Sequence, residues 1–257
     1  MKVRIALVTG ASSGLGRAFA ERLDRYDEVE ELWLVARRRD RLEELAERLA
    51  KPIRILSWDL TKPESMEELK ALLEKESPDL RYLVNAAGFG KFATYADLSL
   101  QETNDMIRLN CQAAVVLTVL SSPYLSRGAR ILEIVSASAF QPLPGLNVYA
   151  ATKAFMLHYS RALRWEVAGR GIVVTAVCPL WIKTEFISVA QDTKNGNTVR
   201  FFPFSSTPGR IASRALLASR LGLGVATCSL PALIQRIAVK FIPHCLIMGL
   251  WSLTKKL

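Results

Sequence analysis

Short apolar runs alternate with longer amphipathic stretches over most of this 257-residue chain. The apolar runs cover residues 3–8, 32–36, 53–57, 81–85, 130–135 and 172–178, lengths typical of strands buried on both faces. The stretches between them have helical periodicity. Two begin with a capping-box pattern, at Thr61–Glu64 and Ser99–Glu102. This alternation predicts an α/β fold: a Rossmann-like doubly wound, mostly parallel sheet with helices on both faces.

Two segments depart from this alternation. Residues 185–208 have little strand or helix periodicity but carry several phenylalanines, and we interpret them as an insertion. Residues 231–257 form an apolar tail for which we expect helices. Arg236, Lys240 and Pro243 interrupt the tail, so it is not predicted to cross a bilayer.

A glycine-rich turn directly follows the first apolar run. It reads Thr9-Gly10-Ala11-Ser12-Ser13-Gly14-Leu15-Gly16 and leads into a helical stretch. Gly10 permits a tight turn, Gly14 lets the backbone approach a pyrophosphate, and Gly16 lets the helix pack against the strand. The N-terminus of the helix then offers N–H groups to the anion. The pattern favours a dinucleotide site over a turn that merely starts a helix, although its G-x-x-x-G-x-G spacing differs from the common G-x-G-x-x-G.

The end of the second apolar run indicates which dinucleotide is bound. The run continues into Ala36-Arg37-Arg38-Arg39. A carboxylate here would bind both ribose hydroxyls and repel a phosphate, whereas the guanidinium of Arg37 suits a 2′-phosphate. Arg37 therefore predicts NADP rather than NAD. We interpret Arg38 and Arg39 as an ordinary basic start of the next helix.

Tyr149 and Lys153 are four residues apart in a helical stretch, which places both side chains on one face. A nearby ammonium favours the phenolate, so the pKa of Tyr149 is predicted to fall toward neutrality. Such a phenol can transfer a proton at physiological pH. Proton transfer is half of a carbonyl reduction, and a hydride donor would supply the other half.

Together these motifs resemble the short-chain dehydrogenase/reductase family, in its order and spacing, from Val3 to about Thr227. Asp59-Leu60 resembles the family's adenine-binding acid and its neighbour. Asn85-Ala86-Ala87-Gly88 resembles Asn-Asn-Ala-Gly, with Ala86 as a departure, and Cys178–Thr184 resembles the Pro-Gly-x-x-x-Thr segment beside the nicotinamide, with Leu180 replacing glycine. The resemblance implies a cofactor site made of Gly10, Ser12, Ser13, Gly14, Leu15, Gly16, Arg37, Asp59, Leu60, Asn85, Gly88, Tyr149, Lys153, Pro179, Ile182 and Thr184.

The resemblance also implies four catalytic residues. Ser136, thirteen residues before Tyr149, would polarise the substrate carbonyl, and Ser138 is the competing candidate. Tyr149 would transfer the proton, while Lys153 would lower the pKa of Tyr149 and bind the ribose of the nicotinamide. Asn110, in a helix with a distorted backbone, would hold a water that relays protons.

Composition and charge exclude several other classes. The net charge is +10, but the basic residues are mixed with glutamates, and the one dense cluster, Arg37–Arg41, has no interleaved aromatics. Nucleic acid is therefore not an expected partner. Four cysteines without CxxC spacing favour a reducing cytoplasm, and no signal peptide is expected. His158 and His244 lack ligand spacing, so no metal site is predicted.

The expected function is an NADP-dependent oxidoreductase that transfers a hydride between NADPH and a ketone or secondary alcohol, with an apolar, ketoacyl-like or steroid-like substrate. Residues 1–230 would form the dinucleotide-binding and catalytic domain, with residues 185–208 as a lid. The tail, residues 231–257, would cap the pocket, enter a homodimer or homotetramer interface, or lie on a membrane. The alternative is a non-catalytic NADP-binding sensor or scaffold, which would have no need of Ser136.

Overall fold

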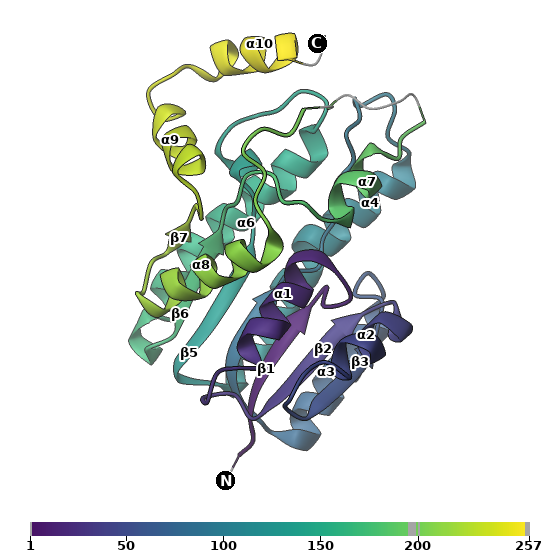
Figure 1. Cartoon of the computed structure of the whole chain (residues 1–257), viewed down its shortest axis with the longest axis vertical. Helices are drawn as coiled ribbons and strands as arrows, with labels where there is room; N and C mark the ends of the chain where they lie inside the picture. The colour runs from purple at the N-terminus through teal and green to yellow at the C-terminus, as the bar shows by residue number, and fades with distance from the viewer. Residues whose placement is uncertain (1, 195–198, 200, 255–257) are drawn as a thin grey trace.

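A computed structural model describes residues 2–194, 199 and 201–254. Within these residues seven strands form one parallel sheet, in the order β3-β2-β1-β4-β5-β6-β7 (Figure 1). The strands are β1 (Arg4–Thr9), β2 (Glu31–Ala36), β3 (Ile53–Ser57), β4 (Asp79–Asn85), β5 (Leu125–Ile134), β6 (Val173–Val177) and β7 (Val225–Ala226). The predicted doubly wound fold is confirmed.

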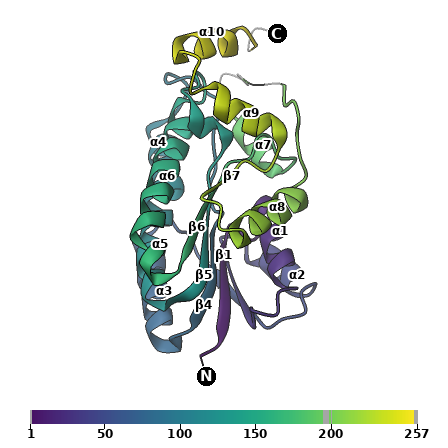
Figure 2. The same ribbon diagram turned by 90° about the vertical axis from the view of Figure 1, so that its left-hand side faces the viewer.

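Apolar residues of the strands alternate between two cores, one on each face of the sheet. In β1, Ala6 and Val8 belong to one core and Ile5 and Leu7 to the other. Figure 2 shows the resulting layers on either side of the sheet. The first layer contains α1 (Gly14–Leu23), α2 (Arg39–Ala46) and α8 (Pro208–Arg220), and the second contains α3 (Pro63–Glu76), α4 (Leu100–Ile107), α5 (Ala114–Ser121) and α6 (Asn147–Glu166).

Only one of the two predicted capping boxes forms. Ser99 accepts a hydrogen bond from the N–H of Glu102, whose carboxylate accepts one from the N–H of Ser99. The prediction at Thr61 is wrong, because α3 begins at Pro63 with Lys62 as its N-cap. The Thr61 hydroxyl instead donates to Asp59, at 2.7 Å.

The sheet order reverses between β1 and β4, and the segments that follow the carboxyl ends of the strands meet above this point. Two of these segments are the single-turn helix η3 (Ala137–Phe140) and α7 (Glu185–Gln191). The tail forms α9 (Leu230–Ala238) and α10 (His244–Thr254), which lie at the same end of the molecule (Figure 1). In the described part of the chain, every helix is too short or too polar to cross a lipid bilayer.

Candidate active site

The glycine turn between β1 and α1 has the shape of a phosphate cradle. Gly10 and Gly14 have φ angles of +66° and +55°, which side chains rarely adopt. A Cβ on Gly16 would lie 2.3 Å from the carbonyl oxygen of Gly10, so the helix approaches the strand too closely for any other residue. Helix α1 begins at Gly14 without a side-chain cap. Its first N–H groups therefore suit an anion.

A cavity of about 930 Å³ runs from this turn to the tail helices. It is lined by residues at the ends of β2 and β5 and by the segments that follow β1, β4 and β6, which is where a doubly wound sheet binds its ligand. The sequence-predicted site residues that line it are Gly10, Ser12, Ser13, Gly14, Leu15, Gly16, Arg37, Asp59, Leu60, Gly88, Ser136, Tyr149, Lys153, Pro179, Ile182 and Thr184.

Two predicted site residues lie outside the cavity wall. The amide of Asn85 is buried and donates to the Glu133 carboxylate at 2.8 Å and to the Thr118 hydroxyl at 3.0 Å. Asn85 therefore supports the sheet and does not face the cavity, contrary to its predicted place in the cofactor site. Asn110 is also buried, one layer behind the wall.

Asn110 links the cavity wall to the helix that carries Tyr149. Its amide accepts from the N–H of Phe89 and donates to the carbonyl of Phe89 and to the hydroxyl of Thr152, at 2.9–3.1 Å. It lies in a π-helical segment, η1 (Arg108–Ala113), which joins α4 to α5. The expected backbone distortion is therefore present at Asn110, and π-segments of this kind are frequent at functional sites.

Tyr149 and Lys153 lie on one face of α6 and are both at least nine-tenths buried. The Lys153 ammonium is 5.7 Å from the centre of the Tyr149 ring and donates to the carbonyl of Ile134 at 2.8 Å. Burial raises the pKa of Tyr149 to about 12 and lowers that of Lys153 to about 8. The predicted fall of the Tyr149 pKa is thus wrong for the cofactor-free protein, because desolvation raises the pKa by more than Ser136 lowers it.

Ser136 is the serine that contacts Tyr149. A hydrogen bond between them opposes the effect of burial on the Tyr149 pKa. The Ser136 hydroxyl also accepts from the N–H of Ser138, which places it at the start of η3. The hydroxyl of Ser138 is buried without a hydrogen-bond partner. The geometry therefore favours Ser136 over Ser138 as the partner of Tyr149.

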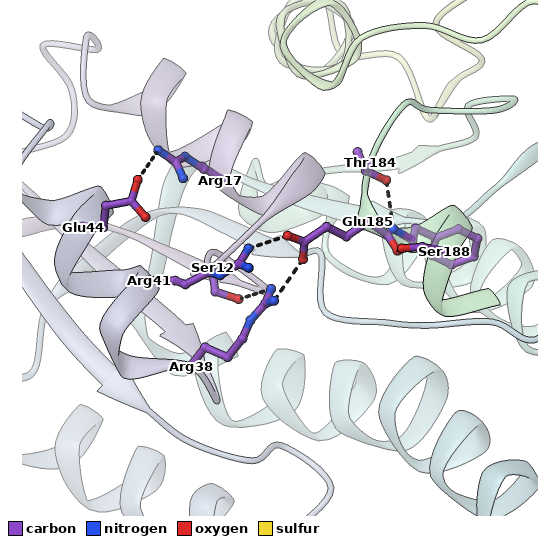
Figure 3. A network of polar contacts seen from close by, with 9 residues as sticks. Ser12, Arg17, Arg38, Arg41, Glu44, Thr184, Glu185 and Ser188 are labelled. Atoms are coloured by element: carbon purple, nitrogen blue, oxygen red, sulfur yellow. Dashed lines mark hydrogen bonds and ion pairs between the residues drawn. The ribbon is translucent and has the colours of Figure 1, made fainter. Parts of the chain in front are cut away.

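Sequence reasoning missed two residues of this site. Arg38 lines the cavity, donates to the Ser12 hydroxyl at 3.2 Å and pairs with Glu185, so it is more than a helix start (Figure 3). Gly90 lies against Tyr149: a Cβ there would be 2.7 Å from the Tyr149 ring. The basic run marked the place of Arg38, whereas no local pattern distinguishes Gly90.

The end of the cavity away from the glycine turn is mainly apolar. Phe186 of α7 lies with its ring centre 5.4 Å from that of Tyr149, and Phe202 packs against Phe92 and Trp181. Phe201 and Phe204 are exposed instead. The further apolar side chains along this part of the wall are Leu143, Leu146, Trp181, Val189, Val239, Ile247, Leu250 and Trp251.

The tail reaches this end of the cavity through specific contacts. The indole N–H of Trp251 donates to the carbonyl of Pro144 at 2.9 Å, and the Gln235 amide donates to the carbonyl of Ala137 at 3.4 Å. One side of each tail helix therefore helps to form the wall. Helix α9 also carries the exposed apolar residues Ile234 and Ile237, and Phe241, between the two helices, is exposed as well.

Comparison with known proteins places the chain in a family. A family model described as short chain dehydrogenase matches residues 4–195. Serine 3-dehydrogenase of Agrobacterium fabrum is 34% identical over 188 residues, which are 71% of this chain and 74% of that enzyme.

Two solved structures are similar over nearly the whole chain. The short-chain dehydrogenase from Sphingobium yanoikuyae in complex with NADPH is 27% identical, with a TM-score of 0.79 over 97% of this chain and 95% of that one. The bulky-bulky ketone specific alcohol dehydrogenase from Comamonas testosteroni is 25% identical, with a TM-score of 0.74 over 95% and 96% of the two chains. The matched segment contains the glycine turn, Ser136, Tyr149 and Lys153, and the chain belongs to the short-chain dehydrogenase family of oxidoreductases.

Proposed function

We propose that this protein is an NADP-dependent oxidoreductase that interconverts an apolar ketone and the corresponding secondary alcohol. The observation that carries the proposal is that one cavity is lined by the phosphate cradle and by Ser136, Tyr149 and Lys153 together. A sensor or scaffold that only binds NADP would not require a serine beside that phenol, so these residues favour the enzyme.

The roles follow from the positions of the groups. Ser136 holds and polarises the substrate carbonyl through a hydrogen bond. Tyr149 donates its phenolic proton to the carbonyl oxygen during reduction and takes it back during oxidation. Lys153 supplies positive charge behind the phenol and is placed to hold the ribose hydroxyls of the cofactor. Asn110 fixes Phe89 and Thr152 around these groups. The nicotinamide, when bound, supplies or accepts the hydride.

NADP is favoured over NAD by the charge at the end of β2. Arg37 and Arg38 both line the cavity there, and the preceding residue, Ala36, offers no carboxylate for the ribose hydroxyls. Guanidinium groups suit a phosphate ester. The neighbour from Sphingobium yanoikuyae carries NADPH, which supports the same choice. Asp59 would contact the adenine.

The substrate class is inferred from the wall opposite the cofactor turn. Aromatic and aliphatic residues from α7, the segment after η3 and the tail surround Tyr149 there. Such a wall stabilises a bulky apolar substrate and excludes water. The Comamonas testosteroni enzyme, described as specific for bulky-bulky ketones, supports this class. We propose that residues 185–208 act as the lid and that the tail closes the pocket; residues 195–198 and 200 of the proposed lid lie outside the described residues.

Replacing Tyr149 by phenylalanine tests the proposal. The variant should lose about 10²–10⁴-fold in turnover of a bulky ketone, since the proton donor is gone. NADPH should still bind, as measured by the change in its fluorescence. The measurement is NADPH oxidation against a ketone panel, starting with the wild type. Turnover that survives the substitution would show that Tyr149 is not the proton donor.

A further inference from the structure

An ion-pair cluster crosses the cofactor cavity at the place proposed for the 2′-phosphate. The carboxylate of Glu185, the first residue of α7, accepts hydrogen bonds from Arg38 at 2.9 Å and from Arg41. The two arginines precede Glu185 by more than 140 residues and follow β2 on the other side of the glycine turn. Figure 3 shows the carboxylate pointing between the two guanidinium groups.

The cluster is anchored on the cofactor turn itself. Arg38 also donates to the hydroxyl of Ser12, within that turn. On the other side, a Cβ on Gly14 would lie only 3.3 Å from Thr184, the residue before Glu185. Ser12, Arg38 and Glu185 all line the same cavity. The ion pair therefore occupies part of the nucleotide site and is not a remote surface contact.

The chemistry of the cluster makes Glu185 resemble an anionic ligand. A carboxylate and a phosphate monoester both accept hydrogen bonds from a guanidinium fork, so they compete for the same donors. The phosphate carries more charge and more acceptor oxygens. NADH has no 2′-phosphate and would not compete with the Glu185 carboxylate for Arg38. The 2′-phosphate of NADPH would need the guanidinium of Arg38, which Glu185 accepts from in the cofactor-free protein.

We propose that Glu185 is an intramolecular competitor of the 2′-phosphate: it holds Arg38 in the cofactor-free enzyme and releases it when NADP binds. The residue thereby sets how strongly the enzyme prefers NADP to NAD. The inference rests on the proposed function, since it assumes that NADP is the cofactor. It adds a residue from the proposed lid to the determinants of cofactor choice.

The test compares NADPH and NADH binding to the cofactor-free enzyme by fluorescence titration, for the wild type and Glu185→Gln. An exposed ion pair changes an affinity by up to about fivefold, so Glu185→Gln should tighten NADPH by roughly two- to fivefold and leave NADH unchanged. Glu43→Gln is the matched control. It removes the same charge from an exposed i,i+4 pair with Arg39, outside the cavity.

A second variant identifies the arginine involved. Arg38→Ala should weaken NADPH binding, and adding Glu185→Gln to it should give no further gain, because the contested donor is gone. Equal tightening of NADPH and NADH, or weaker NADPH binding in Glu185→Gln, would overturn the inference. If the wild type prefers NADPH and Glu185→Gln binds NADPH with the same affinity as the wild type, this inference alone would be overturned. A wild type without that preference would overturn the proposed cofactor as well.

Discussion

Lys153 has its ammonium group inside the protein, where it donates to the carbonyl of Ile134. Ser136 lines the same cavity, and its hydroxyl acts to lower the pKa of the phenol. The two side chains thus approach Tyr149 differently, one as a buried charge and one as a neutral donor. Their substitutions should have different kinetic effects.

Lys153→Met should weaken NADPH binding and move the pH–rate profile to higher pH, since a positive charge beside the phenol is lost. Ser136→Ala should leave NADPH affinity nearly unchanged and lower kcat. Fluorescence titration gives the affinities, and initial rates from pH 6 to pH 10 give the profiles. If the two variants bind NADPH equally well, the assignment of Lys153 as a ribose ligand is wrong.

Arg37 should influence the choice of cofactor. The Arg37→Asp variant places a like charge near the expected 2′-phosphate and offers an acceptor to the ribose hydroxyls, so its preference should move from NADPH toward NADH. The ratio of kcat/KM for the two cofactors measures the effect. A wild type that already prefers NADH would contradict the assignment. Arg38 requires a parallel measurement, because it contacts Ser12 directly.

Glu133 is a buried carboxylate whose titration should affect stability. Burial raises its pKa to about 7, from an ordinary value of 4.5, and one carboxylate oxygen has no hydrogen-bond partner. The unfolded chain therefore loses this proton at a lower pH than the folded protein does. The more tightly bound proton on Glu133 stabilises the folded protein. This contribution to the free energy of unfolding is greatest below the ordinary pKa of 4.5 and is lost as the pH rises through about 7.

Glu133→Gln should remove that pH dependence. Between pH 5 and pH 8 the wild type should lose about 2 kcal/mol of unfolding free energy relative to the variant. Urea unfolding at both pH values measures the difference, with exposed Glu43→Gln as the control. Parallel stability profiles for the wild type and Glu133→Gln would mean that Glu133 does not titrate in this range.

At the scale of elements, the sequence was most informative where periodicity extends over many residues. Six strands overlap their predicted positions, because each contains an apolar run, although only one residue of the edge strand β3 is fully buried. Strand β7 was missed since two residues give no pattern. Helix α7 was missed as well: residues 185–191 have little amphipathic periodicity, and Thr184 begins the helix by accepting from the N–H of Phe186.

Spacing within motifs predicted which residues meet, but not how each is oriented. Ser136, Tyr149 and Lys153 share the cavity as expected. The side chain of Asn85, however, turns toward Glu133 across the sheet, a contact that depends on the pairing of β4 with β5. The pKa of Tyr149 depends on burial, and burial is a property of the assembled molecule rather than of an i,i+4 pair.

The tail helices should be needed for substrate binding. Deleting the segment after Ser229 removes Trp251 and its bond to Pro144, together with the apolar wall from Val239 to Leu250. The truncated protein should fold less well or bind bulky ketones more weakly, in the absence of any lipid. The KM for a bulky ketone, compared with that for a small one, measures the loss. Full activity on both would contradict a capping role.

At the scale of the whole molecule, the tail exposes a group of apolar side chains that another surface would bury. The exposed apolar side chains of α9, α10 and the link between them are Leu230, Leu233, Ile234, Ile237, Phe241, Ile242, Leu246, Leu250 and Leu253, of which Leu250 also lines the cavity. An apolar surface of this kind commonly marks an interface. We expect a homodimer or homotetramer whose interface includes the tail. A cytoplasmic location also remains a prediction.

Light scattering of the intact and truncated chains tests this expectation, since truncation should reduce the oligomer. Liposome flotation tests the alternative. The chain has no Asp or Glu after Asp192, so all charged side chains in the region that follows are basic. This region would be attracted to anionic lipid. Two results together would favour the membrane over the interface. The intact chain would float with anionic vesicles and be released by salt, and the truncated chain would be stable and active.

The π-helical segment around Asn110 has a consequence for how this chain can change in length. A π-turn contains one more residue per turn than an α-helix, so α4 and α5 are out of phase by about 100° relative to a continuous helix. Deleting a single residue between Arg108 and Ala113 would restore a regular helix and rotate Asn110 away from Phe89 and Thr152. Surface loops commonly gain or lose residues at little cost, whereas the segment that joins α4 to α5 needs a fixed number of residues to keep Asn110 in contact with Phe89 and Thr152. The length of this helical segment is therefore part of the candidate active site.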